Sequence, residues 1–256
     1  MTDLRVDERG SALWLTLDGE AHRNALDDEI VIRLTEELNN VSGRPAIRSI
    51  VLTGAGEKVF CAGGNLKADS GPFIADPNRV NHPLKAMFAA LRDCPVPVIA
   101  RVNGAAVGGG LGLTCACDFA IAQDKAIFAT PEIKVGLFPL FILAPMFQIM
   151  PKRVVHDLAF TGRRIDTQEA KSLHIINDYV PLAELDIRVN ALTETLAQHS
   201  RTSYAFGRAA LNAMGSLSYN DAIEYAQRML ILLSQTDDAR EGIAAFREGR
   251  TPQWRG

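Results

Sequence analysis

The chain has 256 residues, of which 47% are apolar and 22% charged, and its formal net charge is −3. This composition suits one large globular domain, or a core domain with a helical appendage, and provides no block of Lys and Arg for binding nucleic acid. We also find no secretory signal and no apolar segment of membrane length, so we expect a cytoplasmic protein that binds neither nucleic acid nor membrane.

The first two-thirds of the chain alternate between strand and helix patterns. Residues 12–17, 47–54 and 96–104 are rich in β-formers and predict buried strands. Residues 27–41 open with acidic residues and carry apolar residues at helical spacing, which predicts a helix. Residues 117–129 predict two strands around a polar turn. This order indicates an α/β body with stacked, largely buried sheets.

From about residue 140 the sequence becomes mainly helical. The apolar stretch VGLFPLFILAPMFQIMP, residues 135–151, is interrupted by prolines and predicts buried helix and loop. A strand is expected at 175–180. Helices are predicted at residues 152–160, 167–173, 182–199, 203–214, 219–234 and 238–247.

Several common kinds of site are not supported by the sequence. The five histidines are scattered, without HExxH or a Cys/His cluster, which argues against a metal site. The glycines fit neither GxGxxG nor a Walker motif, and no GxSxG elbow is present, so a nucleotide fingerprint and a serine hydrolase are disfavoured. The cysteines lack CxxC or disulfide spacing and are predicted to be free, packing thiols: Cys61, Cys94, Cys115 and Cys117.

Two similar junctions lead from a strand into glycines. The first ends at Gly63 and Gly64, and the second runs through Gly108, Gly109 and Gly110. Each can present a bare backbone N–H to a ligand, the second at a helix N-terminus where the dipole favours negative charge. Two converging donors of this kind would form an oxyanion hole, whereas the alternative is a pair of tight turns with glycine at positive φ.

Five segments in order resemble the enoyl-CoA hydratase/isomerase, or crotonase, superfamily. They are DGEAHRNAL (18–26), VLTGAGEKVFCAGGNL (51–66), PVIARVNGAAVGGGLGLTCACDFAIA (97–122), FATPEIKVGLFP (128–139) and EGIAAFREGRTPQW (241–254). The resemblance spans nearly the whole chain. It implies an α/β fold, a crotonase-like spiral of ββα units with the acyl-CoA site in residues 1–180, and a C-terminal helical region in 181–256 that assembles the protein into homotrimers or homohexamers.

The resemblance also implies an acyl-CoA substrate, with coenzyme A as part of the substrate and no separate cofactor. The thioester oxygen would be stabilised by two peptide N–H groups, which map by position to Gly64 and Gly109. Arg23 is expected near the nucleotide phosphates of CoA, unless it is an ordinary exposed charge. The other residues placed along the CoA and acyl site by resemblance are Ala25, Ala62, Asn65 and Leu66.

Proton transfer is where this sequence departs from the family's hydratases, which use two glutamates. The one in the PE segment is present as Glu132, but the position of the other is occupied by Gly112. Apolar neighbours are expected to desolvate Glu132 and raise its pKa. Leu140 stands where the family's dienoyl isomerases carry an aspartate, which argues against that activity. The bulky residues predicted to line the acyl pocket, or else to pack in the core, are Phe138, Leu140, Phe141 and Ile142.

A single glutamate can remove a proton α to the thioester and return it at the γ carbon, so we favour a Δ3-Δ2 isomerase-type proton shuttle on Glu132. One alternative is an enoyl-CoA hydratase, a lyase, in which another acid or base replaces the missing glutamate; Asp69 or Asp76 is a candidate. The other alternative is a non-catalytic acyl-CoA-binding paralogue.

Overall fold

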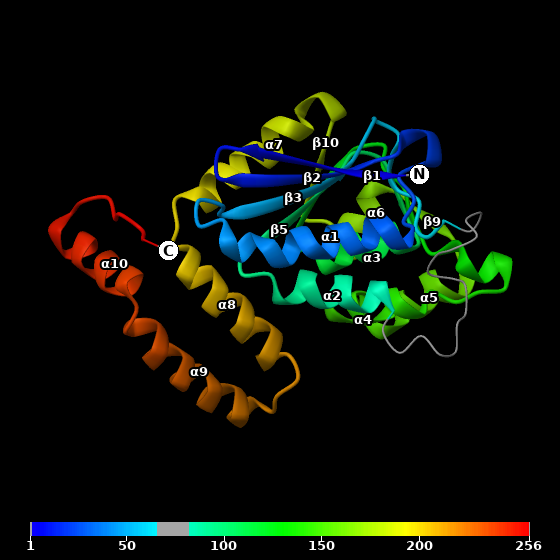
Figure 1. Cartoon of the computed structure of the whole chain (residues 1–256). Helices are drawn as coiled ribbons and strands as arrows, with labels where there is room; N and C mark the ends of the chain where they lie inside the picture. The colour runs from blue at the N-terminus through cyan, green and yellow to red at the C-terminus, as the bar shows by residue number, and fades with distance from the viewer. Residues whose placement is uncertain (1, 66–81, 256) are drawn as a thin grey trace.

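The computed structural model describes residues 2–65 and 82–255, so Leu66, Asp69 and Asp76 lie outside the described residues. Two sheets form its centre (Figure 1). The larger sheet has the order β1 (Asp3–Arg9), β2 (Ala12–Asp18), β3 (Ser49–Gly54), β5 (Val98–Val102), β7 (Phe119–Gln123) and β10 (Asp178–Val180). The smaller sheet has the order β4 (Val59–Cys61), β6 (Ala105–Val107), β8 (Phe128–Ala129) and β9 (Arg164–Ile165).

The chain passes repeatedly from the larger sheet to the smaller one and then into a helix. β3 leads to β4, β5 to β6 and β7 to β8, and along this path neighbouring strands of each sheet pair in parallel. The helices that follow are α2 (Pro83–Asp93), α3 (Gly109–Ala116) and α4 (Leu140–Ile149), the last after the short 3-10 turn η3 (Pro131–Val135). This spiral of ββα units confirms the predicted α/β fold.

The central strands of the larger sheet, β2, β3, β5 and β7, are buried on both faces. Alternate residues of a strand point to opposite faces, so Leu13 and Leu15 join the core beneath α1 (Asp28–Asn40), whereas Trp14 packs with Leu185 and Val189 of α7 (Leu182–Ala197). In Figure 1, α7 lies on one side of the sheet and α1 on the other. The carboxylate of Asp27 accepts a hydrogen bond from Ile30 N at 3.0 Å and caps α1, as the run of acidic residues predicted.

The remaining helices form close to their predicted bounds. They are α5 (Lys152–Thr161), α6 (Thr167–Ser172), α8 (Arg201–Met214), α9 (Tyr219–Ser234) and α10 (Asp237–Glu248), with the 3-10 turns η1 (Glu20–His22) and η2 (Val41–Gly43). Helices α8 to α10 extend away from the sheets (Figure 1). The proposed division into regions 1–180 and 181–256 stays a prediction.

Some local predictions differ from the structure. The stretch predicted as buried helix and loop does form α4, but Leu140, Phe141 and Phe147 are exposed, so it is only half-buried. Only one face of α4 packs against the core, through Ile142 and Met146. The expected strand at 175–180 shortens to β10, and the sequence patterns did not reveal β1, β4, β6, β9 or α2.

Two further observations concern the thiols and the membrane. All four cysteines are free, and Cys61, Cys94 and Cys115 are buried, as predicted for packing thiols. Within 2–65 and 82–255, no helix combines the length and the apolar character that crossing a membrane requires.

Candidate active site

The two glycine junctions meet at the edge of the smaller sheet. Strands β4 and β6 pair in parallel and bring Cys61 opposite Ala106, so the loops after them run side by side. A Cβ atom added to Gly63 would lie 3.0 Å from the backbone N of Gly109, and one added to Gly109 would lie 3.3 Å from Gly63 Cα. Gly63 also has φ +85°, which L side chains rarely adopt. Glycine is therefore required here by a close backbone approach.

Gly64 and Gly109 each hold a backbone N–H that takes no acceptor among the described residues. Gly64 forms a parallel bridge with Leu26, but the bonds of that bridge are Leu26 N to Gly63 O at 2.7 Å and Asn65 N to Leu26 O at 2.8 Å. Gly109 is the first residue of α3, where an N–H has no partner within the helix. Both N–H groups are thus available to a ligand, as an oxyanion hole requires.

The carboxylate of Glu132 lies against the second glycine junction. A Cβ atom on Gly108 would come within 2.7 Å of Glu132 Oε1, which places the carboxylate next to the residue that precedes Gly109. Glu132 is half-buried, and its Oε2 is buried without a hydrogen-bond partner in the described part of the chain. Burial raises the pKa of Glu132, as predicted, although a backbone hydrogen bond opposes the rise. A desolvated carboxylate beside two N–H donors can accept a proton next to a polarised carbonyl group.

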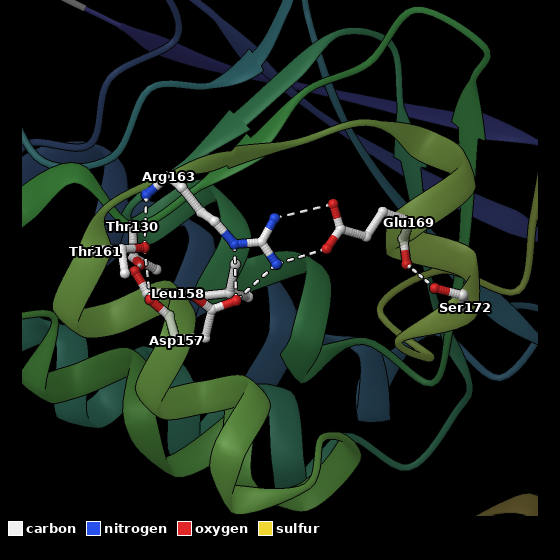
Figure 2. Close-up of polar contacts among 7 residues, drawn as sticks. All are labelled: Thr130, Asp157, Leu158, Thr161, Arg163, Glu169 and Ser172. Carbon is white, nitrogen blue, oxygen red and sulfur yellow. Dashed lines mark hydrogen bonds and ion pairs between the residues drawn. The ribbon is translucent and has the colours of Figure 1, made fainter.

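A hydrogen bond to helix α5 holds the start of the turn that carries Glu132. The hydroxyl of Thr130 donates to Leu158 O at 2.7 Å (Figure 2), and Thr130 is fully buried. At the end of α5, Arg163 donates to Asp157 at 2.7 Å and to both carboxylate oxygens of Glu169 at 2.6 and 3.0 Å. These contacts tie the end of α5 to α6 and hold the base of the Glu132 turn.

Gly112, on α3, is covered by hydrocarbon. A Cβ atom added there would overlap Ile142 Cγ2, lie 2.7 Å from Ile142 Cβ and lie 3.3 Å from Phe88 Cζ. The position at which the resemblance expects the second carboxylate of a hydratase therefore has no room for any side chain unless Ile142 moves.

The structure separates the bulky residues predicted for the acyl pocket. Ile142 reaches Gly112, whereas the Phe138 ring packs on Phe160 of α5, with ring centroids 5.2 Å apart. Leu140, at the start of α4, is 70% exposed, and the Phe141 ring contacts His82 at 4.6 Å. A role for Phe138 or Leu140 in acyl binding stays a prediction.

Arg23 and Ala62 line one cavity of about 380 Å³. Lys134 and Arg164 line it as well, so three cationic side chains from distant parts of the sequence surround one cavity. Sequence reasoning missed these two cations because nothing in their local sequence links them to Arg23. The carbonyl of Arg23 accepts a hydrogen bond from Ala62 N at 3.1 Å, which joins the two predicted CoA-binding segments.

The loop of Arg23 is held by the side chain of its neighbour, Asn24. Arg23 and Asn24 both have positive φ, and Asn24 is fully buried. Its amide donates to Ala55 O at 3.0 Å and to Val59 O at 2.7 Å. This places Arg23, Ala25 and the following bridge to Gly64 beside the first glycine junction. Asn65 lies there too, bonded to Leu26, and Leu66 is outside the described residues.

For a metal ion, the described residues contain no group of three or more His, Cys, Asp or Glu side chains placed to hold one. The described residues bring together a half-buried carboxylate, two backbone N–H groups without an acceptor and a cavity lined by three cations.

Comparisons with known proteins agree with this geometry. A family model described as enoyl-CoA hydratase/isomerase matches residues 7–256. The probable mitochondrial enoyl-CoA hydratase of Dictyostelium discoideum is 31% identical over 250 residues, which cover 97% of this chain and 89% of that protein. Carnitinyl-CoA dehydratase of Escherichia coli K12 is 33% identical over 261 residues, covering 99% and 98%. The crystal structure of an enoyl-CoA hydratase of Mycobacterium smegmatis superposes with a TM-score of 0.91 at 28% identity, covering 98% of both chains.

Proposed function

This chain belongs to the enoyl-CoA hydratase/isomerase family of enzymes, and we propose that it isomerises an unsaturated acyl-CoA thioester with Glu132 as its single base. The N–H groups of Gly64 and Gly109 form the oxyanion hole in this proposal. The observation that carries it is the position of Glu132, whose carboxylate lies against Gly108 with Oε2 buried and unpaired among the described residues.

The proposed reaction shifts a double bond from the 3,4 to the 2,3 position. The carboxylate of Glu132 removes a proton from the α carbon, and the electron pair of that C–H bond moves into a dienolate whose negative charge rests on the thioester oxygen. Gly64 and Gly109 donate to this oxygen, and each such donor contributes about 3 kcal/mol of transition-state stabilisation in known oxyanion holes. Protonated Glu132 then returns the same proton to the γ carbon, so no other reactant is consumed.

Support for a CoA thioester comes from the cationic cavity and from the relatives. Arg23, Lys134 and Arg164 surround a cavity of about 380 Å³ beside the first glycine junction, which suits the phosphates of CoA. The relatives named above are an enoyl-CoA hydratase and a carnitinyl-CoA dehydratase, both acting on CoA thioesters by name. No separate cofactor enters the proposed reaction, because CoA is part of the substrate.

The second candidate is hydration, which the names of those relatives favour. Water addition needs base and acid work on one water molecule, and Gly112 takes the place of the second glutamate. Another group would have to replace it; the candidates Asp69 and Asp76 lie outside the described residues. A non-catalytic acyl-CoA binder is the third candidate, and it predicts binding without turnover.

The substitution Glu132→Gln tests the proposal. We expect isomerisation of a 3-enoyl-CoA, followed by the rise in absorbance of the conjugated product, to fall about 10³-fold, because general base catalysis is lost. Glu184→Gln, an exposed carboxylate on α7, is the matched control and should retain full activity.

Two outcomes would replace the proposal with one of the alternatives. Addition of water to crotonyl-CoA lowers its absorbance. If the parent protein catalyses this loss faster than it isomerises a 3-enoyl-CoA, the protein is a hydratase. Unchanged turnover in Glu132→Gln would remove Glu132 from the mechanism, and binding of acyl-CoA without any turnover would identify the non-catalytic paralogue.

A further inference from the structure

Gly112 and Ile142 form a complementary small and large pair between α3 and α4. Any side chain at residue 112 would overlap Ile142 Cγ2, and its Cβ would lie 2.7 Å from Ile142 Cβ. Ile142 is 4% exposed and belongs to the main core, together with the fully buried Leu111 and Leu113 that flank Gly112. The space that a side chain from α3 would fill is therefore taken by a side chain that comes from α4.

This contact lies one helical turn from the proposed base. Gly112 N donates to Gly108 O at 3.1 Å, and Gly108 is the residue against which Glu132 Oε1 lies. Residues three apart share a helix face, so Gly112 lies on the face of α3 that begins with Gly109. Ile142 thus covers the α3 surface that continues from the oxyanion hole and the carboxylate.

The atoms nearest to a side chain added at residue 112 are all carbon. An added Cβ on Gly112 would meet the aliphatic Ile142 and the ring of Phe88 at 3.3 Å. A buried water molecule needs two to four polar partners, and these two side chains supply none. The volume in which a second carboxylate would hold the water for hydration is filled with hydrocarbon.

We propose that Ile142 is the specificity-determining residue that selects isomerisation over hydration in this protein. Hydration forms a C–O bond between water and the β carbon and adds a proton at the α carbon, so it requires a water molecule beside the acyl chain. With Ile142 in that place, the dienolate is protonated only by Glu132, at the γ carbon. This inference rests on the proposed function, because it assigns the reaction that the same site favours.

The first experiment measures how a 3-enoyl-CoA partitions between 2-enoyl-CoA and its hydrated product. Ile142→Ala opens the space and is expected to raise the share of hydrated product at least about tenfold, the scale on which small changes in pocket volume alter specificity. Gly112→Glu/Ile142→Ala restores a carboxylate in that space and should raise it further. Ile142→Val removes less volume and should raise the share of hydrated product by a smaller factor than Ile142→Ala.

Met146→Ala is the matched control, because Met146 is the other buried residue of α4 and plays no part in the proposed site. An equal rise in hydration in Met146→Ala would overturn the proposal, since loosening of α4 alone would then be the cause. An unchanged product ratio in both Ile142→Ala and Gly112→Glu/Ile142→Ala would also overturn it.

The second experiment uses melting temperatures and needs no activity. Gly112→Ala is expected to lower the melting temperature strongly in the parent chain, because its methyl group meets Ile142. The same substitution made in Ile142→Ala should be neutral or stabilising, since alanine favours a helix over glycine. If Gly112→Ala changes the melting temperature equally in the parent and in Ile142→Ala, residues 112 and 142 are not a complementary pair.

The two experiments separate this inference from the proposed function. If the parent isomerises through Glu132 but the Ile142 variants keep its product ratio, the proposed function stands and the inference fails. If Glu132→Gln retains full activity while the melting temperatures still couple residues 112 and 142, the proposed function fails and only the packing part of the inference survives.

Discussion

At the scale of single residues, Glu132 combines features that structural carboxylates rarely share. Its Oε2 is buried without a hydrogen-bond partner among the described residues, and burial raises its pKa. Buried polar atoms are almost always hydrogen-bonded, so an unpaired carboxylate oxygen indicates a group held ready for a ligand. The cost of its desolvation should therefore appear in both activity and stability.

The raised pKa of Glu132 predicts a specific dependence on pH. The base must be ionised, so kcat/KM should fall with decreasing pH at a value above the ordinary glutamate pKa of about 4.3. In Glu132→Gln, the remaining activity should lose this dependence. A profile that stays flat down to about pH 4 in the parent protein would contradict the assignment of Glu132 as the base.

The same shift predicts how stability changes with pH. Because the pKa of Glu132 is higher in the folded state than in the unfolded one, folding favours its protonated form. The contribution of Glu132 to the stability of the folded protein is fully present below its pKa in the unfolded state. It is lost as the pH rises through its pKa in the folded state. Glu132→Gln should therefore melt at a higher temperature than the parent near pH 7, and the difference should vanish near about pH 4.

Thr130 is a positioning residue for Glu132, and its hydroxyl is the group to test. Thr130→Val removes the 2.7 Å bond to Leu158 O, which then keeps only its bond from Gly162 N at 3.0 Å, and should cost about 0.5–1.5 kcal/mol of unfolding free energy. Because Glu132 follows two residues later, we expect kcat to fall more than KM rises. Thr130→Ser keeps the hydroxyl and should restore kcat; equal losses in the two variants would exclude positioning through this bond.

At the scale of elements, the buried Arg208 makes several of the contacts that join α8 to the body of the protein, where Arg201 and Asn212 also donate hydrogen bonds. Arg208 of α8 donates to Cys94 O at 2.6 Å and to Leu91 O at 2.7 Å, at the C-terminal end of α2. It also forms an ion pair with Asp118, whose carboxylate accepts from Val98 N at 2.7 Å. Carbonyl groups at a helix end lack partners within the helix, so Arg208 both caps α2 and attaches α8 to the sheet.

Arg208→Met is expected to lower the free energy of unfolding by about 2–4 kcal/mol, because it leaves several buried acceptors unpaired. The matched control is Arg228→Met on α9, whose only ion pair in the described residues is with exposed Glu224 and which should change stability by less than about 0.5 kcal/mol. Denaturant unfolding of the variants measures both values. Similar small effects in the two variants would mean that Arg208 contributes little to holding α8 on the body.

At the scale of the whole molecule, helices α8 to α10 expose more apolar surface than a lone chain normally leaves in water. The large apolar or aromatic side chains that are at least half exposed there are Leu211, Tyr219, Ile223, Leu230, Ile231, Leu232, Ile243 and Phe246. Large apolar side chains exposed in such number are typical of a protein–protein interface. We propose that a second copy of the chain covers these side chains, in the homotrimer or homohexamer that the family resemblance implies.

Light scattering should therefore give the mass of a trimer or a hexamer for the parent protein. Leu230→Lys/Phe246→Lys should lower this mass toward that of the monomer, because it introduces charges into the proposed interface, where both side chains are exposed in the single chain. Ile187→Lys, an equally exposed position on α7, is the control and should leave the mass unchanged. A monomeric parent at micromolar concentration would contradict the assembly.

Local patterns predicted most of the elements but missed β1, α2 and several very short strands. Asp27 and the apolar spacing behind it predicted α1 because capping and helical periodicity act within a few residues. Strands β4, β6 and β9 contain three, three and two residues, which is too short for an alternating pattern. α4 was predicted as buried from its apolar content, but Leu140 and Phe141 are exposed because a core contacts only one face of a helix.

The sequence by itself determined the family, the fold class, the two glycine junctions and the candidate base Glu132, since these follow from short motifs and local periodicity. Only the tertiary structure decided that Ile142 fills the space beside Gly112, that Glu132 Oε2 is buried, and that Lys134 and Arg164 share a cavity with Arg23. The reason is physical: backbone preferences act over a few residues, whereas desolvation and the filling of volume depend on side chains that meet only after the chain has folded.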